Sequence, residues 1–144
     1  STQAKTLFPY TTLFRSVMLC DSPTRYMADE ACTRFIASLP VVFDTTRVLA
    51  GEIGEYIVTA RKRQDCWYVG GLTGWTPRTL DVDLSLLDPG REYTATLLAD
   101  DDRSAAEPAR YVLSTQRVTS ATRLQIPVAP GGGFALKIEP ADNK

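Results

Sequence analysis

The chain has no histidine among its 144 residues, and this excludes a whole class of active site. A serine or cysteine nucleophile usually takes its activation from a neighbouring imidazole, so no Ser-His or Cys-His pair can exist within the chain. Cysteine is scarce as well: Cys20, Cys32 and Cys66 are odd in number and have no C-x-x-C spacing. Zinc sites and disulfide frameworks need such spacing, so we expect buried free thiols.

A large excess of charge and a long apolar run are also missing. The 16 Lys and Arg residues nearly balance the 17 Asp and Glu residues, giving a formal net charge of −1. Nothing here matches the basic footprint of a nucleic-acid or anionic-membrane binder. No apolar run approaches the roughly 20 residues of a membrane span. We therefore expect neither nucleic acid nor membrane as a partner, and at most one domain plus a fragment.

Residues 1–16 do not resemble natural protein. Residues 6–16 read T-L-F-P-Y-T-T-L-F-R-S, which resembles the in-frame translation of a sequencing adapter. The alternative is a short amphipathic strand from Leu7 to Phe14. Non-native segments are set aside in fold reasoning. We therefore expect the native chain to start at Val17, where a sequencing read cut it.

Residues 17–39 have the pattern of a strand followed by a helix. Residues 17–20 form a short apolar run, and Ser22 before Pro23 is typical of a helix N-cap with proline at the first helical position. Apolar residues then recur at helical spacing: Ala28, Cys32, Phe35, Ile36 and Leu39. Such spacing predicts one buried helix face up to Pro40, which ends the helix. A strand, a turn and a helix would be the last unit of a β/α barrel.

Asp21 follows this apolar run directly. If residues 17–20 are a barrel strand, Asp21 lies at its carboxyl end, the rim on which barrel enzymes build their sites. Asp21 is therefore the candidate substrate-binding residue. The competing interpretation makes it a structural helix cap together with Ser22, and the pattern favours the cap.

From residue 40 onward the hydrophobic period changes to two. Alternation is clear in residues 56–61, 80–85, 124–128 and 134–138, and turn signals separate these runs. The turn signals are Ala50-Gly51, Gln64-Asp65, Thr76-Pro77, Asp88-Pro89-Gly90, Asp100-Asp101-Asp102 and Pro130-Gly131-Gly132. This pattern predicts a mainly β fold, an antiparallel β-sandwich of seven to eight strands over residues 40–144.

Two groups of carboxylates are candidates for chemistry. Asp81 and Asp83 lie on one strand face, about 7 Å apart between Cα atoms, and glycoside hydrolysis needs a carboxylate pair. Their clean alternation with apolar neighbours favours a solvated strand face instead. Asp88 with residues 100–102 suggests a calcium loop but lacks the spaced ligands and the bidentate Glu of a calcium motif. We therefore predict no metal site and no catalytic residue here.

Glycines and aromatic residues supply two weaker candidates. Residues 131–133 are three glycines without a following Lys-Ser or Lys-Thr, so they are not a phosphate loop. We interpret them as a tight turn with a close backbone approach before the last strand. A sugar-stacking platform is possible in principle, but core packing is the favoured interpretation for its members: Trp67, Tyr68, Trp75 and Tyr93.

Several blocks, in their order, resemble one known family. They are G-E-Y-I-V-T-A-R from Gly54, W-Y-V-G-G from Trp67 and A-P-G-G-G-F from Ala129, preceded by M-L-C-D-S-P from Met18. They are similar to the C-terminal part of glycoside hydrolase family 97, and the resemblance covers residues 17–144. Phe43 and Thr45 stand where the family usually has Trp and Glu.

The resemblance implies three segments: the non-native residues 1–16, the end of a catalytic β/α barrel in residues 17–39, and a C-terminal sandwich in residues 40–144. It implies a parent enzyme that hydrolyses terminal α-glycosidic bonds of glycans, needs Ca²⁺ and is periplasmic or secreted in bacteria. The catalytic carboxylates would lie upstream, so the chain itself is expected to be inactive. Its expected partners are the upstream barrel and further copies of the chain. The alternative function is a free-standing carbohydrate-binding module.

Overall fold

The computed structural model describes residues 22–101, 103, 106 and 110–141. The adapter-like segment, the expected strand at residues 17–20 and the candidate Asp21 lie outside these residues, as do Cys20 and Asp102. The chain divides into two compact units between Val42 and Phe43, and each is described by itself.

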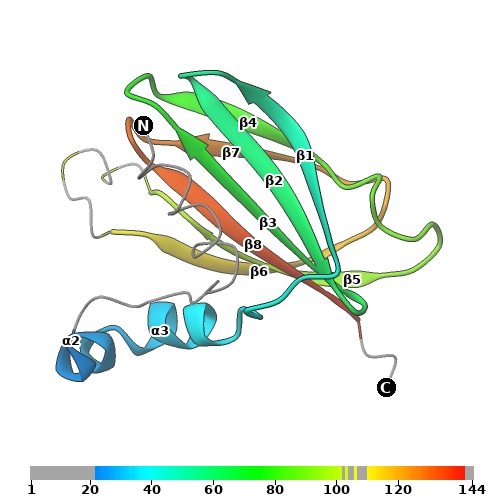
Figure 1. The fold of residues 1–144 in the computed structure, drawn as a ribbon, viewed down its shortest axis with the longest axis horizontal. Helices are drawn as coiled ribbons and strands as arrows, with labels where there is room; N and C mark the ends of the chain where they lie inside the picture. Colours follow the sequence, from blue (N-terminus) through cyan, green and yellow to red (C-terminus); the bar gives the residue numbers. More distant parts are fainter. Residues whose placement is uncertain (1–21, 102, 104–105, 107–109, 142–144) are drawn as a thin grey trace, which may run out of the picture. The chain divides into compact units, whose positions relative to one another are not determined.

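Among residues 22–42 of the first unit, two short helices stand where the apolar spacing predicts one. Helix α2 spans Pro23–Ala28 and helix α3 spans Glu30–Ala37 (Figure 1). The predicted cap is confirmed, because Ser22 accepts a hydrogen bond from the backbone N–H of Arg25. The break comes at Asp29, whose carboxylate accepts a hydrogen bond from the N–H of Cys32 at 3.1 Å and so starts a second helix. An Asp in the middle of a helical pattern competes for backbone donors in this way.

The expected apolar helix face is only partly buried. Phe35 is buried, Cys32 and Ile36 are half-buried, and Ala28 and Leu39 are exposed. Part of the apolar stripe that the helical period defines is therefore accessible in this chain. In the described part of the chain, neither helix has the length or the apolar character needed to cross a membrane.

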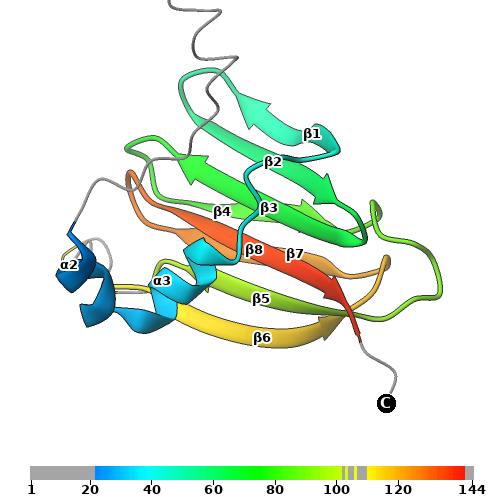
Figure 2. The same cartoon turned by 60° about the horizontal axis from the view of Figure 1, so that its bottom comes forward.

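The second unit is the antiparallel arrangement of eight strands that the period of two predicts. In chain order the strands are β1 Thr45–Glu52, β2 Tyr56–Arg63, β3 Cys66–Thr73, β4 Arg78–Asp83, β5 Tyr93–Ala99, β6 Val112–Val118, β7 Arg123–Val128 and β8 Gly133–Pro140. Six of them form one sheet in the order β1-β2-β3-β8-β5-β6, and β4 pairs with β7 in a second, two-stranded sheet. Figures 1 and 2 show this small sheet lying across one face of the large one.

The core lies between the two sheets and follows strict alternation. In β4, Leu80 and Val82 are buried while Asp81 and Asp83 are exposed. In β2, Val58 and Ala60 face the same core and are fully buried. The remaining inward side chains include Trp67, Val69, Tyr93, Ala95, Ile126, Val128, Phe134, Leu136 and Ile138. Burying each large apolar side chain stabilises the fold by roughly 1.5–3 kcal/mol, so this cluster accounts for the stability of the unit.

Backbone geometry at the turns agrees with the sequence signals except in one place. Positive φ values occur at Gln64, Gly90 and Gly131, within three of the predicted turns. The signal at Ala50-Gly51 was wrong as a turn, because β1 continues to Glu52 and the chain reverses at Gly54, where φ is +82°. A register shift between Val48 and Ala50 marks a β-bulge in this edge strand, which explains why its alternation is irregular.

Candidate interaction surface at one end of the sandwich

Asp81 and Asp83 lie on the solvated face of β4, as their alternation indicates. Asp83 forms an ion pair with Arg123 at 3.1 Å and accepts a hydrogen bond from the N–H of Ser85 at 2.8 Å. These contacts, the Ser85 hydrogen bonds first, hold the pKa of Asp83 below its usual range. A general acid in glycoside hydrolysis needs a raised pKa. Asp83 therefore lacks the raised pKa of a general acid, and both carboxylates are exposed.

The other carboxylates considered as calcium ligands are bound to protein donors. Asp88 accepts a hydrogen bond from the Tyr93 hydroxyl at 3.0 Å, and Asp101 pairs with Arg110 at 3.1 Å. Asp100 accepts from two backbone N–H groups. Across the described residues, no three His, Cys, Asp or Glu side chains are grouped closely enough to hold a metal ion.

Asp100 explains the three consecutive glycines. Its Oδ2 accepts hydrogen bonds from the N–H groups of Ala129 and Gly133, each at 3.0 Å. A Cβ on Gly132 would lie within 1.9 Å of the same oxygen, and one on Gly133 within 2.3 Å of the Gly71 carbonyl oxygen. The interpretation as a tight turn with close backbone approach is confirmed, and the turn is organised by a carboxylate rather than by a ligand.

The four aromatic residues divide between core and surface. Trp67 and Tyr93 are buried in the core, in agreement with core packing. Tyr68 is half-buried on the opposite face of β3, where it packs against Phe43, so core packing is wrong for it. Trp75 is 88% exposed, so core packing is wrong for this residue. Its ring packs along the backbone of Gly131, where a Cβ would lie 3.5 Å from the ring.

A groove of about 510 Å³ opens at the same end of the sandwich, beside the β1–β2 hairpin. Its lining comes from β1, the hairpin turn, β2 and the end of β3: Val48, Gly51, Glu52, Ile53, Gly54, Glu55, Tyr56, Ile57, Leu72, Thr73 and Gly74. Most of these side chains are apolar, and several are exposed, with Ile53 fully so. An exposed apolar surface of this kind marks an interaction site.

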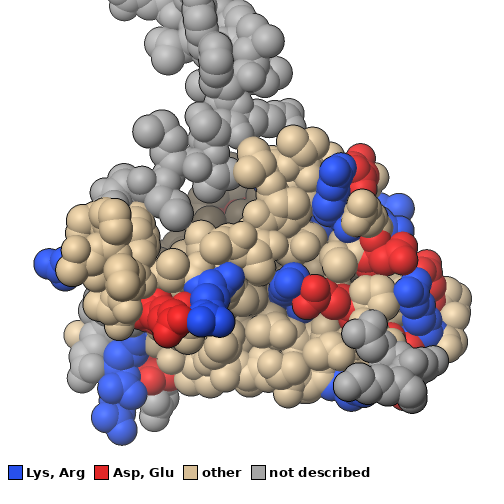
Figure 3. Space-filling view, turned by 90° about the horizontal axis from the view of Figure 1, so that it is seen from below, with Lys and Arg blue, Asp and Glu red and all other residues tan. Residues whose placement is uncertain are grey.

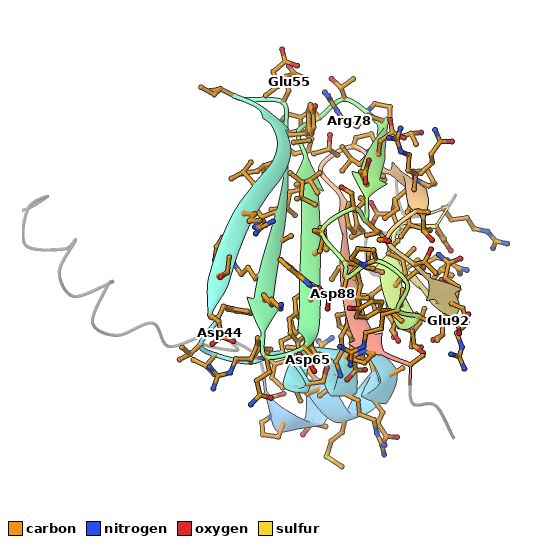
Figure 4. The ribbon with its side chains drawn as sticks, turned by 90° about the vertical axis from the view of Figure 1, so that its right-hand side faces the viewer. Asp44, Glu55, Asp65, Arg78, Asp88 and Glu92 are labelled. Atoms are coloured by element: carbon orange, nitrogen blue, oxygen red, sulfur yellow. The ribbon has the colours of Figure 1, made fainter. Side chains whose placement is uncertain are left out.

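Two acids line the groove, Glu52 and Glu55, and one of them is paired. Glu55 and Arg78 form an ion pair at 2.5 Å, and the Arg78 guanidinium stacks over the Tyr56 ring at 4.8 Å. Figure 4 shows Glu55 and Arg78 at one end of the strands, with Asp44 and Asp65 at the opposite end. On the face seen in Figure 3, basic and acidic side chains are interspersed without a broad field of one sign. The groove is therefore mainly apolar, with Glu52 and the Glu55–Arg78 pair at its rim.

The opposite end of the strands is held by Asp44. Its carboxylate accepts from the Gln64 N–H at 2.7 Å and pairs with Arg63 at 2.8 Å. The Gln64 hydrogen bond, followed by the Arg63 contact, lowers the pKa of Asp44. Phe43 packs edge-on against Tyr68, with ring centroids 5.7 Å apart. The polypeptide that precedes the sandwich is thus attached at this end.

Sequence reasoning missed the groove because its apolar residues look like ordinary strand residues. Ile57 next to Val58 puts apolar side chains on both faces of β2, and in β3 Leu72 lies on the face opposite the buried Val69. That break in alternation was the available signal. Cys32 and Cys66 are free and half-buried rather than buried, and burial is the main cause of their raised thiol pKa values.

Comparison with known proteins shows to which family the sandwich belongs. Residues 42–139 match the family model described as glycosyl-hydrolase 97 C-terminal, oligomerisation. The chain belongs to glycoside hydrolase family 97. It corresponds to the C-terminal, oligomerisation domain of that family, which confirms the resemblance stated from the sequence motifs.

Relatives within family 97 agree with this placement. The chain is 45% identical over 122 residues to a retaining α-galactosidase from Bacteroides thetaiotaomicron, covering 85% of this chain and 18% of that protein. It is 32% identical over 117 residues to a probable retaining α-galactosidase from Streptomyces bingchenggensis, covering 81% of this chain and 17% of that one. The chain thus spans less than a fifth of the length of these relatives.

Solved structures of the family match the fold. A family 97 enzyme from Pseudoalteromonas sp. strain K8, determined in complex with acarbose, superposes with a TM-score of 0.81 at 27% identity. The match covers 85% of this chain and 20% of that enzyme. A β-arabinopyranosidase matches with a TM-score of 0.66 at 27% identity, covering 81% and 18%.

Proposed function

We propose that the chain is the non-catalytic C-terminal part of an enzyme that hydrolyses terminal α-glycosidic bonds, and that it holds copies of that enzyme together. The observation that carries the proposal is the 45% identity to a retaining α-galactosidase combined with the role of each carboxylate described above. Asp83, Asp88, Asp100 and Asp101 all bond to protein donors within the sandwich. Terminal α-galactosides are accordingly the first substrates to test.

A direct assay separates this function from catalysis by the chain itself. The chain should give no turnover of aryl α-galactosides or aryl α-glucosides, with or without calcium. The matched variants Asp81→Asn and Asp83→Asn remove the carboxylate pair with little change in shape. Turnover by the chain that disappears in either variant would contradict the proposal.

We also propose that the calcium ion expected for the parent enzyme is bound outside this domain. The donor chemistry supports this, because Asp88 and Asp101 are occupied by a hydroxyl and a guanidinium and Asp100 by backbone N–H groups. Calcium should therefore leave the melting temperature of the chain unchanged. A calcium-dependent rise would place a site here, since ligands that bind only the folded state stabilise it.

Trp75 keeps a second function open, that of a carbohydrate-binding module. Its 88% exposed ring is the kind of flat aromatic surface on which a pyranose stacks. The chain has two tryptophans, and the other, Trp67, is buried. A change of tryptophan fluorescence on adding galactose or an α-galactoside would therefore report on Trp75. The scaffold function predicts no such change.

Two further proposals concern the parent protein. We propose that it is secreted or periplasmic, as its relatives' glycan chemistry suggests, and that Asp21 lines the rim of its catalytic site. Fractionation of cells expressing the full gene tests the first. For the second, Asp21→Asn in the full enzyme should raise KM and leave the melting temperature nearly unchanged. If Asp21 is instead a helix cap, the substitution should lower the melting temperature and leave KM nearly unchanged.

A further inference from the structure

Four exposed apolar side chains line the groove, and a fifth, Trp75, follows the lining residue Gly74 in the chain. Together they define what we term the hairpin-end patch: Val48, Ile53, Ile57, Leu72 and Trp75. Their exposed fractions are 66%, 103%, 43%, 64% and 88%. A single exposed apolar side chain needs no explanation, but a contiguous group around a groove does.

Strand register produces the hollow in this patch. Ile57 on β2 lies directly opposite Leu72 on β3 and opposite Gly51 on β1. Because glycine has no side chain, the β1 side of Ile57 is left open, and a groove forms over Gly51. Val48 lies further along β1 on the same face, since it pairs with Thr59. The groove therefore has apolar side chains on both sides of Gly51.

Trp75 projects beside this groove from a rigid turn. The Gly74 N–H donates to the Glu55 carbonyl at 2.6 Å, and the Gly131 N–H donates to the Gly74 carbonyl at 2.7 Å. The turn that carries the tryptophan is thus tied to both the β1–β2 hairpin and the glycine turn. A preorganised aromatic anchor loses little entropy on binding, and tryptophan is among the residues most enriched at the centres of interfaces.

The arrangement favours a second copy of the chain as the occupant. The exposed Trp75 directly follows Gly74, which lines the groove, so an anchor adjoins a receiving groove, as a two-fold, self-complementary contact requires. Of the two acids in the lining, Glu55 is paired with Arg78, which leaves Glu52 as the other acid at the rim. The family model that matches the sandwich is described by oligomerisation, which favours a second copy over another partner.

Phe43, the first residue of the second unit, lies at the other end of the strands. Phe43 packs on Tyr68, which pairs with Arg61 four residues along the strands from the Ile57–Leu72 pair. Four residues of strand span about 13 Å. The preceding polypeptide therefore joins at the opposite end of β2 and β3 from the patch (Figure 4).

We propose that the hairpin-end patch is the surface through which two copies of the domain associate about a two-fold axis, each placing Trp75 against the groove of the other. This inference rests on the proposed function in oligomerisation and adds to it the surface, the anchor and the symmetry. Ile57 and Leu72 form the centre of the contact, and Ile53 forms its margin.

The test is sedimentation velocity of the chain over a range of concentrations, with one variant in the patch and one matched control. Ile57→Glu places a carboxylate in the groove. Leu113→Glu places one on β6 of the same sheet, on a side chain with the same 43% exposure. Trp75→Ala, in an exposed turn, checks the anchor without altering a strand. Thermal unfolding of each variant shows that it is folded.

The proposal predicts that the chain self-associates and that Ile57→Glu and Trp75→Ala each raise the dissociation constant roughly 30-fold or more, which corresponds to about 2 kcal/mol for a hot-spot residue. Leu113→Glu should leave it unchanged. Association that is equal in all three variants would overturn the patch as the interface but leave oligomerisation intact. A chain that is monomeric at every concentration would overturn both. A loss of sugar-induced fluorescence change in Trp75→Ala, with association unaffected, would assign the patch to a glycan instead.

Discussion

Two adjacent glycines in the W-Y-V-G-G block of β3 should respond in opposite ways to the same substitution. Gly71 faces the core and lies opposite Phe134 of β8. A Cβ at Gly71 would lie 2.2 Å from Cε1 of the Phe134 ring, which is itself only 7% exposed. The ring has to move in a packed interior, and overpacking of this kind costs about 1–3 kcal/mol. Gly71→Ala should therefore be clearly destabilising.

Gly70 is the matched control, because it differs mainly in the direction its Cβ would point. The nearest atom to that Cβ would be the Phe134 carbonyl oxygen at 3.9 Å. Alanine at such a position stabilises by about 0.4–1 kcal/mol, since it lowers the entropy of the unfolded chain. The two variants should thus differ by about 2–3 kcal/mol, or roughly 10–20 °C in melting temperature for a unit of this size.

Thermal unfolding followed by circular dichroism measures this difference. The double variant Gly71→Ala with Phe134→Leu removes part of the ring and should recover some of the lost stability, giving a favourable coupling between the two sites. Equal melting temperatures for the two glycine variants would refute the reasoning, because the close approach to the ring would then have no energetic consequence.

Three further outcomes follow. Asp100→Ala leaves the N–H groups of Ala129 and Gly133 without their acceptor, so it should destabilise the chain by about 2 kcal/mol or more; a melting temperature within a degree or two of the parent chain's would show that the carboxylate does not organise the glycine turn. Folding lowers the pKa of Asp44. The stabilisation of the fold by its carboxylate is therefore complete above the unfolded pKa of about 3.9 and is lost as the pH falls through the folded pKa. Asp44→Asn should flatten the fall of melting temperature between about pH 5 and pH 2, and an unchanged slope would contradict this. Deletion of residues 1–16 should leave the melting temperature unchanged, and a drop of several degrees, equivalent to about 1 kcal/mol, would show that they pack on the native fold.

Alternation predicted the sandwich well because each strand has one face on the core and one in solvent. Leu80 and Val82 against Asp81 and Asp83 are the clearest case, and burial in the structure follows the pattern residue by residue. The same reasoning confined the Asp81–Asp83 pair to the surface. Where a strand is apolar on both faces, as at Ile57-Val58, alternation does not tell which face lies on the core and which is exposed. The groove was therefore not predicted.

Local side-chain hydrogen bonds and contacts between residues far apart in sequence account for the other differences between prediction and structure. The apolar spacing predicts one helix through Asp29, but the structure has a helix end there. The Asp29 carboxylate accepts a hydrogen bond from the Cys32 N–H and caps a second helix. Gly51 was interpreted as a turn although it lies within β1, where the bulge of an edge strand obscures the period. Trp75 was expected in the core because tryptophan usually is. Its exposure depends on the turn hydrogen bonds to Glu55 and Gly131, which involve partners far away in sequence.

We propose that this chain brings copies of a glycoside hydrolase together and supplies none of its chemistry. Size-exclusion chromatography with light scattering, followed by an aryl α-galactoside assay on every fraction, tests both parts of this proposal in one experiment. We expect a mass above that of the monomer, rising with concentration, and no turnover in any fraction. A monomer mass at every concentration, or turnover that elutes with the protein, would contradict it.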